Sequence, residues 1–459
     1  MTASVTTTHP EYDDNLPKWQ KVDNLVKSDV KQYLRNVGKS EPDIAKQTAR
    51  QKEYEDGAIL DNFTQKTLTG LTGSAFLKSP TIELQSNLEY LVTDVDGAGT
   101  TLEQQAKEAV DQDLRKGRFG ILADMPVTEG ETTLASMENG STVPRISRYY
   151  AENIINWKFR TFGSTQLLDL VVLTEETDAA TDEFSHETEL QYRVLALDEE
   201  GYYYQQVYDN EFNASEPIYP RQSGELMTRI PFFFIGVSDN TASVDASPIF
   251  PIAEINIGHY RNSADTEENS FVCSQSMLVI APGENITTDQ WQKANPDGVR
   301  IGSRRGLNVG AGGSASFIQA QESDKAQRLM EMKKEQAVEL GAQIIQSGVQ
   351  ITAESARIQQ SVNHSTLSSI AGNVTTAYRD ALTVCAGFLG SDYDSDFALN
   401  QDFYMETLTA QDRAQWVSEI MQGVTPRALY YRKLREVGEF PDDWTDEEIT
   451  AQLETQGLL

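Results

Sequence analysis

Residues 251–276 of the chain are PIAEINIGHYRNSADTEENSFVCSQS. Pro251 suits the first turn of a helix, and Ile252 and Ile255 begin an apolar stripe. The stripe then gives way to polar residues, namely His259, Asn262, Ser263, Thr266, Asn269 and Ser270. A helix this polar is not expected to bury a face in the core of a monomer. We expect it either to bridge solvent or to pack against other polar helices.

The sequence that follows this helix predicts a strand-rich segment and then more helices. Residues 277–319 are rich in glycine and predict strands at Met277–Ala281, Val299–Ser303 and Ser314–Gln319. A second helix is predicted over Asp324–Gln346, followed by a break at Gly348. A long helix near 353–389 then keeps strict three-four apolar spacing. The last 55 residues predict a small helical region with a capping box from Thr445 to Glu448.

The sequence before the polar helix predicts an antiparallel sheet over residues 163–236. A turn at 198–201 joins two alternating runs, Leu190–Ala196 and Tyr202–Tyr208, which are typical of a hairpin.

The N-terminal part of the chain predicts mainly helices. Residues 20–80 are expected to be mostly helical, with Gly70 and Gly73 breaking the pattern. A further helix is predicted to start at a Thr100–Glu103 capping box and to end at Gly117. Residues 1–15 are polar and are expected to form a mobile tail rather than a signal peptide.

Composition excludes several classes of protein. A chain of 459 residues is too long for one ordinary core, so two or three structural regions are expected. The formal net charge is −32, which disfavours a protein that wraps DNA by neutralising its phosphates. No apolar run is long enough to cross a membrane, so no membrane partner is expected. Two cysteines without a CxxC pair indicate a reducing compartment.

No motif in the chain makes a positive case for catalysis. The four histidines are scattered, without an HxxxH or HExxH pair for a metal. Gly38-Lys39-Ser40 ends like a phosphate-binding loop, but Tyr33 stands where that loop needs glycine. If Gly97 were the sixth position of a calcium loop, the first would be Val92, which cannot bind calcium. No cofactor, metal or catalytic residue is therefore predicted.

Four segments in order resemble the phage portal proteins of the DUF4055 type. Two of these segments, 299–320 and 352–390, resemble the family's "IGS" segment and its long "TAxxAR" helix, although Gln319 or Gln321 stands where an acid is usual. The other two are the glycine loop, helix and strand DVDGAGTTLEQQAKEAVDQDLRKGRFGILADMP at 94–126 and YYAENIINW at 149–157.

The resemblance implies an α+β portal-protein fold that assembles as a ring, typically of twelve subunits. Beyond the tail, its parts would be a wing of helices and antiparallel sheet (16–250), a first stem helix (251–276), a clip (277–319), a second stem helix (320–346), a tunnel loop with a long wing helix (347–394) and a helical crown (395–459).

The implied function is structural and not enzymatic. The ring would be the head-to-tail connector at the portal vertex of a tailed-phage virion, assembled in the host cytoplasm. Double-stranded DNA would pass through it without sequence specificity during packaging and ejection. The implied protein partners are the major capsid protein, terminase, and head-to-tail adaptor or tail proteins.

Two groups of residues are candidates for contact with DNA or partners. Seven basic and three acidic residues lie between Val299 and Lys334, a window of +4 in an acidic chain. These basic residues could touch DNA, touch partner proteins or form salt bridges between subunits; they are Arg300, Arg304, Arg305, Lys325, Arg328, Lys333 and Lys334. The tunnel-loop candidates are Gln350, Thr352, Glu354, Arg357, Gln359 and Gln360.

Two other functions compete with this interpretation. Another ring-forming virion component, such as a head-to-tail adaptor, would share the assembly but is usually a much shorter chain. An acidic soluble enzyme would need a concave site with convergent polar groups, for which the sequence offers no candidate.

Overall fold

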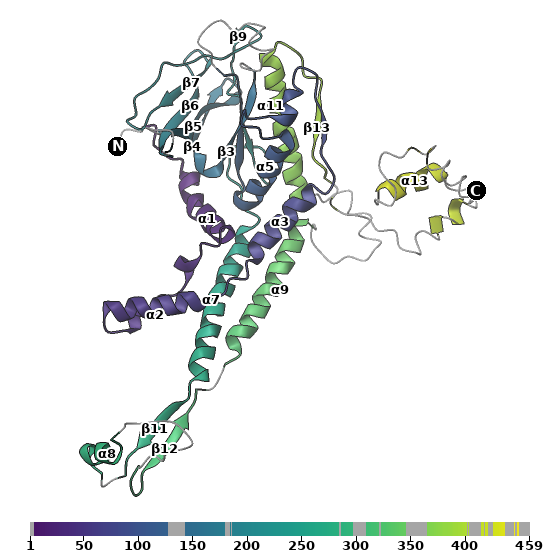
Figure 1. Ribbon diagram of the computed structural model, residues 1–459. Helices are drawn as coiled ribbons and strands as arrows, with labels where there is room; N and C mark the ends of the chain where they lie inside the picture. Colours follow the sequence, from purple (N-terminus) through teal and green to yellow (C-terminus); the bar gives the residue numbers. More distant parts are fainter. Residues whose placement is uncertain are drawn as a thin grey trace. The chain divides into compact units, whose positions relative to one another are not determined.

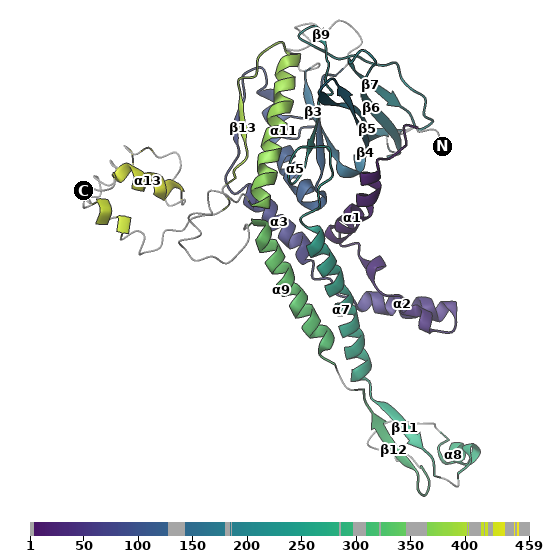
Figure 2. The same cartoon turned by 180° about the vertical axis from the view of Figure 1, so that it is seen from behind.

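The structure is a computed structural model in two units, Met1–Leu399 and Asn400–Leu459. It describes residues 4–126, 143–179, 184, 186–283, 286–296, 309–320, 323–345 and 365–401, and in the second unit also 403, 415–416, 418–420, 426–436, 445 and 448. Figures 1 and 2 show the elements from opposite sides. Helices are combined with sheets whose described strand pairs are all antiparallel, which confirms the α+β class.

Two antiparallel sheets share one hydrophobic core in the first unit. The larger has the order β4-β5-β6-β7, and the smaller has the order β10-β2-β3. Their bounds are β2 (Phe119–Asp124), β3 (Arg145–Tyr150), β4 (Ile154–Phe162), β5 (Thr165–Asp178), β6 (Thr188–Leu197), β7 (Tyr203–Tyr208) and β10 (Phe232–Ile235). The register pairs Leu197 with Tyr203, which confirms the predicted hairpin. Side chains from both sheets meet in the core, among them Trp157 and Phe234.

Helices α5 (Leu102–Lys116) and α11 (Thr366–Phe388) pack against each other and against the smaller sheet. Their predicted apolar stripes are buried, in α11 from Leu367 to Phe388. The predicted cap of α5 is wrong by one residue, because Thr101 and Gln104 form the capping box. The carbonyl of Thr100 instead accepts a hydrogen bond from the amide of Val95 and closes the preceding loop. Gly117 ends the helix in the left-handed conformation, as predicted.

The N-terminal helices differ from the prediction in two places. Helix α1 (Pro10–Val26) begins inside the segment predicted as a mobile tail. That prediction is wrong because Tyr12 and Trp19 bury their rings against the sheet region, and His9 caps the helix. Helix α3 (Phe63–Ala75) runs through Gly70 and Gly73, since burial of its apolar face outweighs the low helix propensity of glycine. The remaining elements here are η1 (Lys31–Tyr33), η2 (Gly38–Ser40), α2 (Ile44–Gly57) and α4 (Tyr90–Thr93).

Two long helices, α7 (Phe250–Ser274) and α9 (Lys325–Ile345), lie side by side in both views (Figures 1 and 2). The prediction that α7 cannot bury a face in a monomer is wrong, since Ile252, Ile257 and Tyr260 are buried. Two of the buried polar residues on this face, Asn256 and Ser263, have hydrogen-bond partners, and the hydroxyl of Ser263 accepts from the amide of Ile59. Asn256 accepts from the amide and hydroxyl of Thr64 and donates to the carbonyl of Asp61. The alternative expectation, packing against other polar helices, describes the contacts of α7 with α1, α2, α3 and α9.

A two-stranded hairpin follows α7 and precedes α9. Strand β11 (Met277–Ala281) pairs in antiparallel register with β12 (Ser314–Ile318), which confirms two of the three strands predicted here. The third, Val299–Ser303, lies outside the described residues. The sequence missed helix α8 (Thr288–Ala294), which starts at a capping box of Thr287 and Gln290. Both views place this hairpin beyond the ends of α7 and α9 (Figures 1 and 2).

The division of the chain near residue 400 corrects the predicted start of the crown. Strand β13 (Asp396–Ala398) pairs with β1 (Thr81–Glu83) and so belongs to the first unit, where a short pair β8 (Arg221–Gln222) and β9 (Glu225–Leu226) also lies. In the second unit, α13 (Arg427–Glu436) is one helix of the small helical region predicted over the last 55 residues. Thr445 and Glu448 form the predicted reciprocal capping bonds.

Candidate functional site

Four of the seven predicted basic residues lie on α9. They form two groups along the helix, Lys325 with Arg328 and Lys333 with Lys334. Lys333 is partly buried, and its Nζ donates to the carbonyl oxygen of Gly258 at 3.0 Å and to Oδ1 of Asn262 at 2.5 Å. Burial, followed by the neighbouring Arg261 and Arg35, lowers the pKa of Lys333. This side chain therefore joins α9 to α7 and is not available to DNA or to a partner.

Lys334, next in the chain, is an exposed cation with a local partner. Its Nζ lies 3.0 Å from Oδ2 of Asp61, which also pairs with Lys66 at 2.7 Å. Hydrogen bonds from Lys66 and Lys334 lower the pKa of Asp61. The exposure of Lys334 means that this pair contributes little to stability, because solvent screens it.

Lys325 and Arg328 begin α9 at its end near the hairpin, and both side chains are exposed. Arg328 pairs with Asp324 one turn earlier, with both groups largely in solvent. Because an exposed ion pair one turn apart is weak, Arg328 can exchange Asp324 for a partner on another molecule. Of the four described cations, these two are the best placed to contact another molecule.

The other predicted site residues fall in segments that the structure does not describe. Arg300, Arg304 and Arg305 lie within 297–308, and the whole tunnel-loop set lies within 346–364. The predicted roles of Gln350, Thr352, Glu354, Arg357, Gln359 and Gln360 therefore stay predictions.

Exposed apolar side chains near the hairpin are a feature that the sequence analysis missed. Phe271 and Val272, at the end of α7, are 65% and 49% exposed. In the hairpin, Met277, Val279, Phe317 and Ile318 are also exposed. The apolar residues of β11 and β12 were the available signal, because an isolated two-stranded hairpin cannot bury them. Large exposed apolar surface of this kind marks an interaction site.

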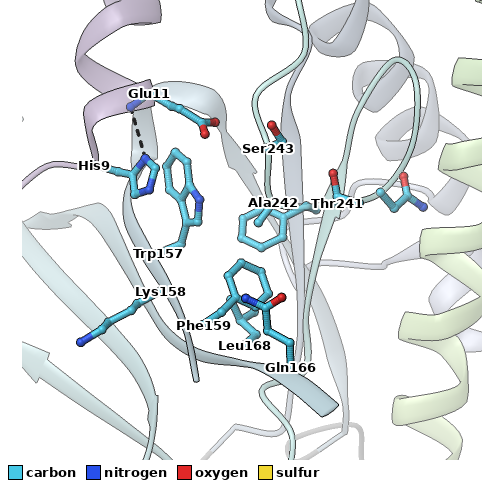
Figure 3. Close-up of a pocket in the computed structure, with 12 residues that line it drawn as sticks. His9, Glu11, Trp157, Lys158, Phe159, Gln166, Leu168, Thr241, Ala242 and Ser243 are labelled. Carbon is cyan, nitrogen blue, oxygen red and sulfur yellow. Dashed lines mark hydrogen bonds between the residues drawn. The ribbon is translucent and has the colours of Figure 1, made fainter. Parts of the chain in front are cut away.

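A pocket of about 710 Å³ lies between the start of α1 and the larger sheet (Figure 3). The ring of His9 stacks on Trp157 with centroids 3.9 Å apart, and Nδ1 of His9 accepts the amide of Glu11 at 3.2 Å. Burial lowers the pKa of His9, which favours the neutral ring that this acceptor role needs. His9 thus caps α1 and attaches it to the sheet, which is a structural use of the residue.

Arg118, behind this pocket, is a second residue whose role the sequence analysis missed. It is 1% exposed, and its Cζ lies 4.1 Å from the ring centroid of Trp157 and 4.3 Å from that of Phe234. Nη1 donates to the carbonyl of Ala242 at 2.6 Å. Burial lowers the pKa of Arg118 to about 9, so the group stays charged at neutral pH. Its place just before the apolar run Phe119–Ala123 of the stretch at 94–126 was the signal that could have indicated a core role.

The described residues offer neither a membrane-spanning helix nor a cluster of metal ligands. None of the helices described is both long and apolar enough to cross a bilayer. Within the same residues, His, Cys, Asp and Glu side chains do not gather into a group that could hold a metal ion. Cys273 and Cys385 are both buried.

A pair of neighbouring substitutions tests the two kinds of lysine on α9. Lys333→Met is expected to lower the free energy of unfolding by about 1–3 kcal/mol, because two partly buried acceptors on α7 lose a charged donor. Lys334→Met is the matched control and should cost about 1 kcal/mol or less, because its ion pair is exposed. Thermal and denaturant melts of both variants provide the measurement. Equal losses would show that Lys333 does not join the helices.

Comparison with known proteins places one family on this part of the chain. Residues 248–389, from just before α7 to the end of α11, match the family described as "Domain of unknown function (DUF4055)". This match confirms the resemblance for that segment, whereas the motifs at 94–126 and 149–157 lie outside it. No curated protein matches the chain.

Several solved structures share a low level of similarity with the chain. One is from the "Virion of native gene transfer agent (GTA) particle", with 14% identity over 82% of this chain and 89% of that chain, at a TM-score of 0.40. Two others are from the "Neck of empty GTA particle computed with C6 symmetry" and the "Neck of native GTA particle computed with C12 symmetry". Both have 14% identity and the same coverage, at a TM-score of 0.41.

Proposed function

Because the DUF4055 match covers the two long helices and the hairpin between them, we propose that this chain is a portal-type connector subunit of a virion. In this proposal α7 and α9 are the two stem helices, the hairpin with α8 is the clip, and the sheet region is the wing. The observation that carries the proposal is this matched segment, in which a helix pair ends in a hairpin with exposed apolar side chains on both strands. Such a surface needs partners, and a ring of identical subunits supplies them on two sides.

The charge of the chain supports a conduit for DNA. A protein that lets a duplex slide in both directions must avoid many tight phosphate contacts, since each contact adds salt-dependent affinity. A net charge of −32 provides a mostly repulsive wall that keeps DNA centred without sequence-specific contacts. We therefore propose that the protein acts at the portal vertex of a tailed-phage-like virion, during packaging and ejection, without an enzymatic step of its own.

The clip is the proposed docking site for other proteins of the particle. Its exposed strands offer apolar contacts, and Arg300, Arg304 and Arg305 of the basic window offer positively charged ones. Terminase during packaging and head-to-tail adaptor or tail proteins afterwards are the proposed partners. The wing would face the major capsid protein.

The oligomeric state of the purified chain tests this proposal. We expect a closed ring of about twelve subunits, because a chain with two different interacting sides closes into a ring when its rotation permits. Mass photometry at micromolar concentration and physiological salt measures the subunit number directly. A stable monomer under these conditions, alone and after co-expression with the capsid scaffold, would contradict the proposed function.

A further inference from the structure

The pair formed by α7 and α9 has two different sides. In both views α7 lies between α2 on one side and α9 on the other (Figures 1 and 2). The contacts agree, because α7 packs against both helices. Arg50 of α2 pairs with Glu268 of α7, and the hydroxyl of Tyr54 donates to Asp265 at 2.7 Å. These bonds fix α2 against α7 and leave a groove between the two helices.

This groove is lined by both acidic and apolar side chains. It has a volume of about 760 Å³, and four carboxylates and one arginine are among its lining residues. Two of these carboxylates are in ion pairs, Glu268 with Arg50 and Asp56 with Lys31. Glu53 and Glu267 are exposed, and the exposed faces of Phe271 and Val272 complete the lining. We call this lining the acidic groove.

The first turns of α9 present cations beside an apolar side chain. Lys325 and Arg328 are exposed at the start of α9, and Met332 follows one turn later with 45% of its surface exposed. These three residues lie on one helical face, since they are three and four positions apart. We call them the basic face.

The acidic groove and the basic face lie at the same level along the helix pair. Nδ2 of Asn269 on α7 donates to the carbonyl oxygen of Ser323 at 3.5 Å, just before α9. The hydroxyl of Thr266 on α7 contacts the sulfur of Met330 on α9 at 3.7 Å. The groove residues from Ala264 to Val272 are therefore level with the first turns of α9. If neighbouring subunits are related by rotation about an axis that runs along the helix pair, equivalent residues in all subunits lie at the same height along that axis.

We propose that in the assembled ring the acidic groove of one subunit receives the basic face of the next subunit. This inference rests on the proposed function, because it names the contact that closes the proposed ring. Carboxylates of the groove face the cations Lys325 and Arg328 of the next subunit. A contact between two different surfaces of identical chains is heterologous, the type that generates rings. It assigns Lys325 and Arg328 to contacts between subunits and leaves DNA and partner proteins to other residues.

Charge reversal on either side tests this contact. Lys325→Glu/Arg328→Glu places acids against the acidic groove, and Glu53→Lys/Glu267→Lys places cations against the basic face. Each double variant is expected to lose at least about tenfold in the fraction of rings at physiological salt, since like charges at an interface oppose association. Glu199→Lys/Glu200→Lys, in the exposed β6–β7 turn, is the matched control and should leave the rings unchanged.

Recombining the reversed sides makes the test specific. The chain with all four substitutions should form rings again, because the complementary charges are restored in exchanged positions. Mixing the two double variants should also restore rings, now with alternating subunits, since each basic groove meets an acidic face. Mass photometry follows the rings, and thermal melts check that every variant is folded.

Two outcomes are distinguishable from failure of the proposed function. If the unmodified chain forms rings and both double variants form them equally well, this contact is wrong while the portal proposal stands. If each double variant is folded and loses its rings but neither recombination recovers them, the pairing is also wrong. A folded unmodified chain that never forms a ring overturns both proposals.

Discussion

Replacing Arg118 with alanine is expected to lower the free energy of unfolding of the sheet region by about 3–5 kcal/mol. The guanidinium lies between the rings of Trp157 and Phe234 in the shared core of the two sheets. Its loss would leave a cavity there, and the carbonyl of Ala242 would lose its donor. The buried carboxyl of Asp113, whose pKa burial raises, would also lose its nearby cation.

The design of this experiment separates packing from charge. Arg118→Met keeps a long side chain between the two rings, so we expect it to cost less than Arg118→Ala. Arg221→Ala removes an exposed arginine and should change stability by about 0.5 kcal/mol or less. Denaturant unfolding followed by tryptophan fluorescence reports on the region, because Trp157 is in contact with Arg118. If Arg118→Ala is no more harmful than Arg221→Ala, Arg118 does not stabilise the core.

Changing Arg304 and Arg305 to glutamate is expected to leave the ring intact and to reduce the yield of DNA-filled, tailed particles by about tenfold or more. The two arginines lie in a glycine-rich stretch between the predicted clip strands, within the basic window of the sequence. Adjacent charges in such a stretch are usually solvated, so they are available to partners. Each exposed charge contact is worth about 1 kcal/mol or less, but a ring repeats it in every subunit.

Particle assembly with each variant measures the effect, and Arg304→Lys/Arg305→Lys is the control that keeps both charges. Failure of the glutamate variant to form rings would assign these arginines to subunit contacts. Normal packaging and tail attachment would show that they are ordinary surface.

The sequence predicted those helices and strands whose whole pattern of apolar and polar residues lies within one segment. The three-four spacing of α11 and the alternation of β6 and β7 are visible within single segments, and both elements are confirmed. The pairing of β1 with β13 joins three-residue strands that lie over 300 positions apart, so no local pattern indicates it. Helix α1 was missed at its start because its few buried rings, such as Tyr12, take their meaning from contacts with the sheet region.

The candidate site was predictable as a set of charges but not as a set of roles. In the sequence, Lys333 and Lys334 are adjacent lysines in one predicted helix, and no local pattern distinguishes their roles. Their difference arises from Gly258 and Asn262 on a separate helix and from Asp61, which is 273 positions away. The acidic groove depends on α2 and α7, whose contacts such as Arg50 to Glu268 span more than 200 positions. Long-range packing therefore decides which charges are structural and which face another molecule.

Electron cryomicroscopy of the purified full-length chain tests the central claim most directly. We expect a closed ring with an open channel, in which α7 and α9 of every subunit surround the channel and the hairpins form one end. A compact monomer, or an assembly without a channel between the helix pairs, would contradict the account.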